Sequence, residues 1–98
     1  MSLPLVFHPE ARPEVDEAHK WYERRTPGLG NDFLAAVEVV FERIVESPEI
    51  HSVLFRGVRR AMVRRFPYGV SYRIHDDRLE VVAIAHHRRD PNVWRSRL

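Results

Sequence analysis

The stretch that decides the fold runs from residue 68 to residue 86. It reads Tyr68-Gly69-Val70-Ser71-Tyr72-Arg73-Ile74-His75, then Asp76-Asp77-Arg78, and then Leu79-Glu80-Val81-Val82-Ala83-Ile84-Ala85-His86. In the first part, large side chains alternate with small or polar ones, which is the period of a strand with one buried face. Asp76-Asp77 predicts a tight turn, so the two segments form a hairpin. The last segment is apolar on both faces, which is typical of a central strand covered on both sides.

The half of the chain before this hairpin has the period of a helix. Apolar residues recur every three or four positions from Ala11 to Tyr22 and again from Phe33 to Ile44, which predicts two amphipathic helices. Thr26-Pro27-Gly28-Leu29-Gly30 lies between them and predicts a turn, so the helices form an antiparallel hairpin. The large aromatic residues that we expect in the core are Trp21, Tyr22 and Phe33.

The starts of both helices carry signals of their own. Pro13 is unfavourable inside a regular helix, so either the first turn is distorted or the regular helix begins at Pro13. Asn31 or Asp32 is expected to cap the second helix, because their short polar side chains accept hydrogen bonds from the first helical N–H groups.

Two further strands complete the predicted sheet. Leu3–Phe7 precedes the first helix, and Val58–Phe66 follows the second. The order β-α-α-β-β-β predicts an α+β fold, with a helical hairpin packed on one face of a mainly antiparallel four-stranded sheet. Residues 87–98 form a short tail, in which Asp90-Pro91 predicts a final helical turn. At this length, residues 1–98 make a single domain.

Charge is divided unevenly between the two halves. Residues 1–50 carry ten acidic and five basic side chains, a net charge of −5. Residues 51–98 carry four acidic and eleven basic side chains, all of the latter Arg, a net charge of +7. Because the planar guanidinium group binds phosphate and carboxylate through two hydrogen bonds, the second half is expected to meet a polyanion or an acidic partner.

The composition also excludes several classes of protein. There is no Cys, so disulfides and thiolate metal sites are excluded, and His75, His86 and His87 lack the carboxylates that would complete a zinc site. We therefore expect no metal and no cofactor. The apolar runs are too short for a membrane span, and Met1-Ser2-Leu3-Pro4 does not resemble a signal peptide. These features predict a cytoplasmic protein with no membrane partner.

A group of arginines lies in and beside the predicted strand 58–66: Arg56, Arg59, Arg60, Arg64 and Arg65. Strand alternation places some of them on each face of the sheet. A guanidinium row beside the Tyr side chains of the next strand is typical of an RNA-binding surface. It equally fits an acidic protein segment. The alternative without a function is a solvated sheet edge on which Arg prevents aggregation.

His86-His87-Arg88-Arg89-Asp90 follows the predicted central strand. The sheet holds such a strand end rigidly, so a His there can act as a general acid or base, and nearby Arg favours its neutral form. Neighbouring side chains point to opposite faces, so one of the two His is packed. We assign that structural role to His86 and leave the role of His87 open. Trp94 either anchors the tail to the sheet, the simpler interpretation, or contacts a partner.

Taken in order, several segments resemble the toxins of the RelE/ParE superfamily, which includes the plasmid-stabilisation proteins. They are Trp21-Tyr22-Glu23 with Gly28-Leu29-Gly30 and Phe33, then Arg65–Tyr72, then Val81–His86 with Arg89-Asp90-Pro91 and Trp94–Arg97. The similarity covers nearly the whole chain, and β-α-α-β-β-β is that family's fold. It implies a bacterial type II toxin that inhibits growth unless a cognate antitoxin wraps an extended or helical segment around it.

The resemblance leaves the target open. RelE-like members cut mRNA on the ribosome, whereas ParE-like members poison DNA gyrase without cutting RNA. The ending of this chain is closer to the ParE-like members, so we favour gyrase. The target- or antitoxin-binding residues are then expected on the basic strand and tail, at Arg56, Arg60, Arg88, Arg89, Trp94 and Arg97. Replacing both Trp94 and Arg97 with Ala is expected to abolish toxicity and leave the fold intact.

If the chain is instead a ribonuclease, it is metal-independent, and the ribose 2′-OH attacks the adjacent phosphate. Arg59, Arg64 and Arg65 would then stabilise the developing charge, while Tyr72 and His87 would transfer protons. RelE-like sites combine Lys with Arg, but this chain has a single Lys, in the first helix. Because Arg is a poor general base, the scarcity of Lys argues against the ribonuclease interpretation. A third alternative is a degenerate, non-toxic member that only binds its antitoxin.

Overall fold

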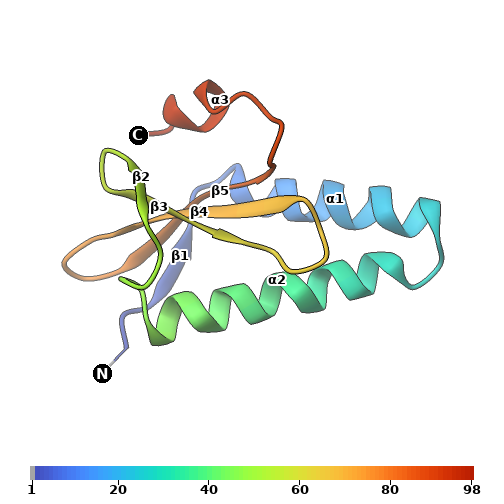
Figure 1. Ribbon diagram of the computed structural model, residues 1–98, viewed down its shortest axis with the longest axis horizontal. Coiled ribbons are helices and arrows are strands. Elements are labelled where there is room, and N and C mark those ends of the chain that lie inside the picture. The colour runs from blue at the N-terminus through green and yellow to red at the C-terminus, as the bar shows by residue number, and fades with distance from the viewer. Residues whose placement is uncertain (1) are drawn as a thin grey trace.

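The computed structural model describes residues 2–98, which form a helical hairpin against a five-stranded sheet, with a short helix on the sheet's other side (Figure 1). In chain order the elements are β1 (Leu5–Phe7), α1 (Ala11–Arg25), α2 (Leu29–Glu46), β2 (Val53–Phe55), β3 (Val58–Met62), β4 (Tyr68–Ile74), β5 (Leu79–His86) and α3 (Asn92–Arg95). The predicted α+β fold is confirmed, although the sheet has five strands rather than four. None of the helices described is long and apolar enough to cross a membrane.

The strand order is β1-β5-β4-β3-β2, with β1 parallel to β5 and every other pair antiparallel. β5 is therefore central, as predicted. Its ladder with β4 contains a bulge, because Ser71 pairs with Ala83 but Tyr72 pairs with Val81. Val82 is the extra residue, and a bulge of this kind shifts the alternation of side chains along the strand. Both faces of β5 are buried, because the helical hairpin covers one and α3 covers the other.

The additional strand, β2, was not predicted because it is short and half exposed. Val53 and Leu54 are 51% and 49% exposed, so they show no alternation between a buried and a solvated face. β2 pairs with β3 through the turn Arg56-Gly57, in which both residues have positive φ, 47° and 79°. Positive φ at both central residues is the geometry that closes two-residue hairpins.

The predicted strand 58–66 was too long, since β3 ends at Met62. Residues 63–67 form a turn, closed by the hydrogen bond from the Val63 N–H to the Tyr68 carbonyl at 2.8 Å. Pro67 has no N–H for a ladder hydrogen bond, and Phe66 turns into the core, where it is 7% exposed. Arg64 and Arg65 therefore lie in the turn and not on the strand.

The helix starts also differ from expectation. α1 begins at Ala11 and holds Pro13 in its first turn, where no N–H has an intrahelical partner, so the proline costs little. The prediction that Asn31 or Asp32 caps α2 was wrong. Instead, the α1 side chain of Glu23 accepts hydrogen bonds from the N–H groups of Gly28 and Gly30, at 2.9 and 3.0 Å.

Aromatic side chains fill the core between the helical hairpin and the sheet. The rings of Tyr22 and Phe33 each contact Phe66, with centroids 4.9 and 5.3 Å apart. Trp21 was expected in this core but is 45% exposed on the outside of α1, with the Arg25 guanidinium 4.4 Å from its ring. Trp21 and Tyr22 are adjacent on one helix, so the sequence pattern alone did not decide which of them faces inward.

A second, smaller core lies on the other face of the sheet. α3 packs there, on the opposite side from α2 (Figure 1). Trp94 is only 6% exposed and contacts Val58, Val82 and Ala83. The expectation that Trp94 anchors the tail to the sheet is confirmed.

Candidate functional site

The face of the sheet that carries α3 also carries a pocket of about 290 Å³, which we call the basic pocket. It contains three arginines, two histidines and the one buried polar side chain of the described core, Ser71, which is 3% exposed. The lining residues are Leu54, Arg60, Gly69, Ser71, Ala85, His86, His87, Arg89, Pro91, Trp94 and Arg95.

The arginines give this pocket its electrostatic character. Arg89 is partly neutralised, because its guanidinium lies 3.2 Å from a Glu14 carboxylate oxygen. Within residues 2–98, Arg60 and Arg95 form no ion pair. Arg95 instead lies over the Phe55 ring, 4.2 Å from its centroid, which fixes the guanidinium without neutralising it. Two uncompensated cations around a concave surface favour an anion such as phosphate or carboxylate.

The two histidines differ in which ring nitrogen carries a lone pair. Their rings stack, with centroids 4.7 Å apart. His86 Nδ1 accepts the Arg88 N–H at 3.1 Å, so neutral His86 carries its proton on Nε2. Burial, followed by the charges of His87 and Arg88, lowers the pKa of His86. His87 Nδ1 lies 3.3 Å from the Pro67 carbonyl, a contact that requires a proton on Nδ1 and leaves Nε2 as the basic atom.

No metal site accompanies these side chains in the part of the chain that the structure describes. Among residues 2–98, no group of three or more His, Asp or Glu side chains is placed to hold an ion.

Two residues predicted for RNA cleavage lie on the opposite face of the sheet and serve the fold. Tyr72 is fully buried, its hydroxyl donates to the Pro48 carbonyl at 2.6 Å, and burial raises the pKa of Tyr72. The same hydroxyl lies 3.0 Å from His51 Nδ1. Arg59, paired with Tyr72 across the ladder, donates to the carbonyls of Glu49 and His51 at 3.1 and 2.6 Å. Together they hold the loop between α2 and β2.

The remaining predicted catalytic residues are divided between two places. Arg64 and Arg65 lie in the β3–β4 turn beside α2, where they line a separate groove. His87 alone of the five lines the basic pocket. The structure therefore does not bring Arg59, Arg64, Arg65, Tyr72 and His87 together.

The predicted binding residues are closer to one another. Arg60, Arg89 and Trp94 line the basic pocket, although Trp94 contributes a packed side chain and not an exposed one. Arg88 is exposed in the segment that follows β5. Arg56 lies in the β2–β3 turn, with its guanidinium 5.1 Å from the centroid of Phe55.

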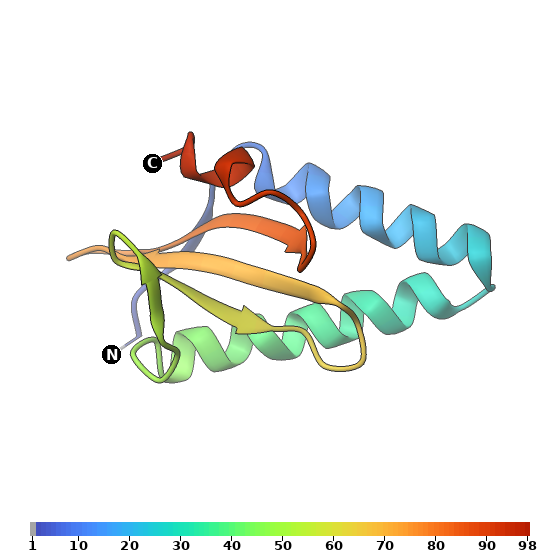
Figure 2. The same ribbon diagram turned by 45° about the horizontal axis from the view of Figure 1, so that its top comes forward.

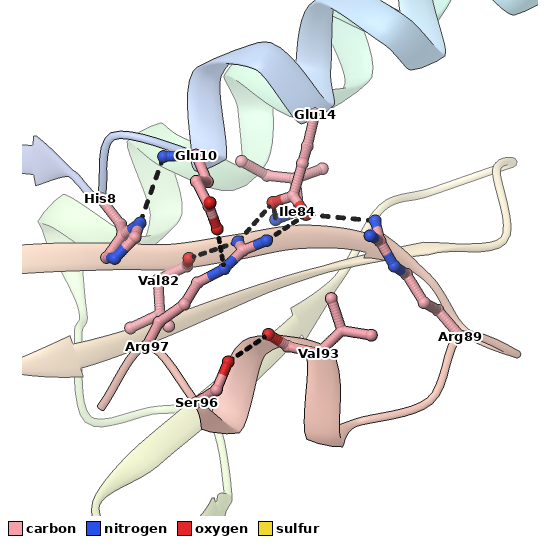
Figure 3. A network of polar contacts seen from close by, with 9 residues as sticks. All are labelled: His8, Glu10, Glu14, Val82, Ile84, Arg89, Val93, Ser96 and Arg97. Carbon is pink, nitrogen blue, oxygen red and sulfur yellow. Dashed lines mark hydrogen bonds and ion pairs between the residues drawn. The ribbon is translucent and has the colours of Figure 1, made fainter.

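Arg97, the sixth predicted binding residue, is enclosed by a polar network (Figure 3). Its side chain is 6% exposed and makes a bidentate ion pair with Glu14, both N–O distances being 2.9 Å. Its Nε also lies 3.0 Å from a Glu10 carboxylate oxygen. Trp94 anchors the second core and Arg97 holds a buried ion pair, so we now expect the double Ala variant to be destabilised, contrary to the expectation from the sequence.

The same network covers an open edge of β5. β1 is so short that its pairing with β5 ends at Val81. Beyond that point, Arg97 donates to the Val82 carbonyl at 3.0 Å, and Glu14 accepts the Ile84 N–H at 3.0 Å (Figure 3). Two side chains thus satisfy backbone groups that a longer β1 would have paired.

Sequence reasoning missed Glu14, Ser71 and Arg95. Glu14 carried a signal, since it lies three residues after Ala11 and four before Ala18 and so falls on the apolar stripe of α1. A carboxylate on such a stripe indicates a buried cationic partner. Ser71 and Arg95 carried none, because their place in the pocket depends on how α3 packs across the sheet.

Comparison with known proteins agrees with this architecture. The family model described as "ParE toxin of type II toxin-antitoxin system, parDE" matches residues 5–91. Toxin ParE2 of Mycobacterium tuberculosis, from strains CDC 1551 / Oshkosh and ATCC 25618 / H37Rv, is 28% identical over 94 residues, covering 95% of this chain and 90% of the relative.

A solved structure supports the fold independently. A chain of the "Chromosomal ParDE TA system from P. aeruginosa" superimposes with a TM-score of 0.65 at 17% identity, covering 86% of this chain and 95% of that one. The family match extends over most of the sequence, from the start of β1 to the residue before α3. This chain therefore belongs to the family of ParE toxins of type II toxin–antitoxin systems.

Proposed function

We propose that this toxin component of a type II pair arrests growth by binding DNA gyrase in the cytoplasm and trapping its DNA-cleaved state. A cognate antitoxin, which membership of the family implies, neutralises it. Such a poison needs no catalytic residue of its own. It needs a surface that binds the enzyme–DNA complex more tightly when the DNA is cut than when it is sealed.

The observation that carries this proposal is the separation of the side chains that RNA cleavage would use. Phosphodiester cleavage needs a base, an acid and cationic donors around one phosphate. Here Tyr72 and Arg59 are bonded to the α2–β2 loop, on the opposite face from His87. Arg64 and Arg65 are in a third place.

The basic pocket is the surface we assign to the target. The uncompensated charges of Arg60 and Arg95, with exposed Arg88 nearby, would pair with DNA phosphates or carboxylates of the gyrase complex. Trp94 contributes by fixing α3, and therefore Arg95, over the sheet.

A second candidate function is RNA cleavage by a different set of residues. The observation that favours it is the lone pair on Nε2 of His87, in a pocket shared with Arg60 and Arg95. His87 would act as the base for the 2′-OH, and the arginines would stabilise the charge that develops on the phosphate.

Inducing the chain alone in a bacterium distinguishes these functions. Growth arrest with an induced DNA-damage response, and without new RNA 5′ ends, is expected for a gyrase poison. New 5′ ends clustered within translated codons would overturn the proposal in favour of RNA cleavage. Normal growth with abundant folded protein would indicate a non-toxic member that only binds its antitoxin.

Variants connect the arrest to the basic pocket. Replacing Arg88 and Arg95 with Ala is expected to relieve growth arrest, because it removes two exposed cations that would pair with the target. The matched control replaces Lys20 and Arg24 of α1 with Ala, which removes the same two positive charges from another exposed surface. Full toxicity of the Arg88→Ala, Arg95→Ala variant would remove this part of the surface from the mechanism.

A further inference from the structure

A further concave surface, which we call the aromatic cleft, lies between α1 and the end of β5. α1 continues past the point where β5 ends (Figure 2), and the cleft there has a volume of about 440 Å³. Four aromatic side chains line it: Trp21 and Tyr22 of α1, Tyr68 of β4 and His86 of β5. The cleft is large enough for a small ligand or for one long side chain of another protein.

Successive rings around the aromatic cleft are steeply inclined to one another. The Trp21 and Tyr22 rings are at 89°, with centroids 5.0 Å apart. Tyr22 and Tyr68 are at 64° and 6.1 Å, and Tyr68 and His86 are at 75° and 5.5 Å. Rings that face in different directions are how proteins surround a cation, because each ring face carries partial negative charge. Trp21, whose ring type attracts cations best, is the most exposed of the four, at 45%.

The ionisable side chains of the cleft leave one carboxylate without a counter-charge. Glu14 is compensated by its ion pairs with Arg89 and Arg97. Glu17 also lines the cleft, and within residues 2–98 it forms no ion pair. His86 contributes a ring but no charge at neutral pH, since burial is the main cause that lowers its pKa. The cleft is therefore acidic, in contrast to the basic pocket.

Two phenol hydroxyls in the cleft are also without partners. Of the three tyrosine hydroxyls, only that of Tyr72 has a hydrogen-bond partner within residues 2–98. Burial raises the pKa of Tyr68, and the charges of Arg89 and Glu17 then lower and raise it respectively, so both charges lie near this hydroxyl. Burial, and then the charge of Tyr68, raise the pKa of Tyr22, so the two hydroxyls lie near one another. Three hydrogen-bond acceptors thus converge on one cleft.

These features select a guanidinium group as the ligand. A guanidinium is planar and stacks on aromatic faces, and its N–H groups donate at its edges, where Glu17 and the two hydroxyls accept. The Trp21 ring already shows this preference, because the Arg25 guanidinium lies 4.4 Å from its centroid, although Arg25 does not line the cleft. The charge of Glu17 would repel a phosphate, and an apolar ligand would cover the hydroxyls without hydrogen-bonding to them.

We propose that the aromatic cleft binds a guanidinium group, which stacks against Trp21 and forms an ion pair with Glu17. The hydroxyls of Tyr22 and Tyr68 accept its remaining N–H groups. A free small molecule and an arginine side chain of a protein carry the same group, so both are possible sources. None of these four residues lines the basic pocket, and the inference is independent of gyrase as the target.

The test is an NMR titration of the isotope-labelled full chain, followed through its indole N–H signals. The chain has two Trp residues, and Trp94, buried in the second core, is the internal control. Trp21→Phe assigns the two signals. The probe is arginine blocked as its N-acetyl methylamide, and the matched neutral probe is the citrulline derivative, which has the same shape without the charge.

The site variant is Glu17→Gln. Its matched control is Asp16→Asn, which removes the same charge from an adjacent, exposed position that does not line the cleft. Unchanged backbone amide spectra check that both variants are folded.

We expect the blocked arginine to shift the Trp21 signal with a Kd of about 1 mM or lower, and to leave the Trp94 signal in place. The citrulline probe, and the arginine probe with Glu17→Gln, are expected to bind at least about five-fold more weakly. Asp16→Asn is expected to stay within about two-fold of the wild type.

The absence of a Trp21 shift, equal binding of the two probes, or equal weakening by the two variants would overturn the proposal. So would binding of guanosine without binding of the arginine probe, which would assign the cleft to a nucleobase.

The same titration distinguishes the two sources of the guanidinium. Tighter binding of free arginine than of blocked arginine would identify a small molecule, because only the free amino acid carries its own ammonium and carboxylate groups. Tighter binding of the blocked form would identify an arginine side chain of a protein. Neither gyrase nor antitoxin is present, so the result does not depend on how the toxin acts.

Discussion

The carboxylate of Glu14 and the guanidinium of Arg97 form a bidentate ion pair, in which both N–O distances are 2.9 Å. The pair joins α1 to the end of the chain. Both side chains are nearly buried, at 10% and 6% exposure. The hydrogen bond to Glu14 is the main cause that raises the pKa of Arg97. The same two groups satisfy the open edge of β5, so the pair stabilises the sheet as well as the tail.

Removing one partner of this pair is expected to destabilise the protein strongly. Glu14→Gln leaves Arg97 with only the exposed Glu10, and Arg97→Met leaves Glu14 with only the exposed Arg89, so either change is expected to cost up to about 3–5 kcal/mol of unfolding free energy. Urea denaturation measures the change, and Glu17→Gln on the exposed side of α1 is the matched control. A cost below about 1 kcal/mol would show that the pair behaves as an exposed one.

Trp94→Ala is expected to release the tail from the sheet. The side chain is 6% exposed in the second core, and truncating a buried Trp costs about 3–5 kcal/mol. Val93→Ala is the control, since Val93 is adjacent and 36% exposed. Equal, small changes in the two variants would mean that α3 does not depend on Trp94. Any loss of toxicity in Trp94→Ala must therefore be compared with its loss of stability.

Acid is expected to weaken the loop between α2 and β2 through His51. Burial, and then the charges of Arg43 and Arg59, lower the pKa of His51 below its ordinary value of 6.5. The unfolded chain therefore binds the proton more readily than the folded chain. The unfolding free energy that neutral His51 contributes is fully present above pH 6.5, and it is lost as the pH falls from 6.5 towards the lower pKa of the folded state.

Unfolding free energies measured between pH 7 and about pH 5 test this effect, because Asp and Glu titrate mainly below that range. His51→Asn is expected to flatten the dependence on pH. The lowered pKa of His86 contributes a slope of the same sign, so some dependence remains in the variant. A slope equal to that of the wild type would contradict the role given to His51.

The fold could be predicted from the sequence where its signals are local. The alternation of Tyr68–Ile74 and the helical stripes of α1 and α2 each reflect one buried face, and all three elements form as expected. β2 has no such face, and the bulge at Val82 changes which residues share a side of the sheet. Neither feature leaves a periodic trace in the sequence.

The candidate site could be predicted only in part, for a related reason. Residue type and proximity along the chain singled out Arg60, His87 and Arg89, which line the basic pocket, but they did not decide which face a side chain occupies. Arg59 and Arg60 are adjacent, yet one holds a loop and the other lines the basic pocket. That difference follows from strand register, which the number of residues between two strands does not determine.

Whether this toxin poisons gyrase is measured by incubating the purified chain with DNA gyrase and supercoiled plasmid and then denaturing the enzyme. If gyrase is the target, linear DNA accumulates with increasing toxin, and the Arg88→Ala, Arg95→Ala variant produces less of it. Complete resealing of the plasmid by gyrase, even in an excess of toxin, would show that the toxin does not trap cleaved DNA.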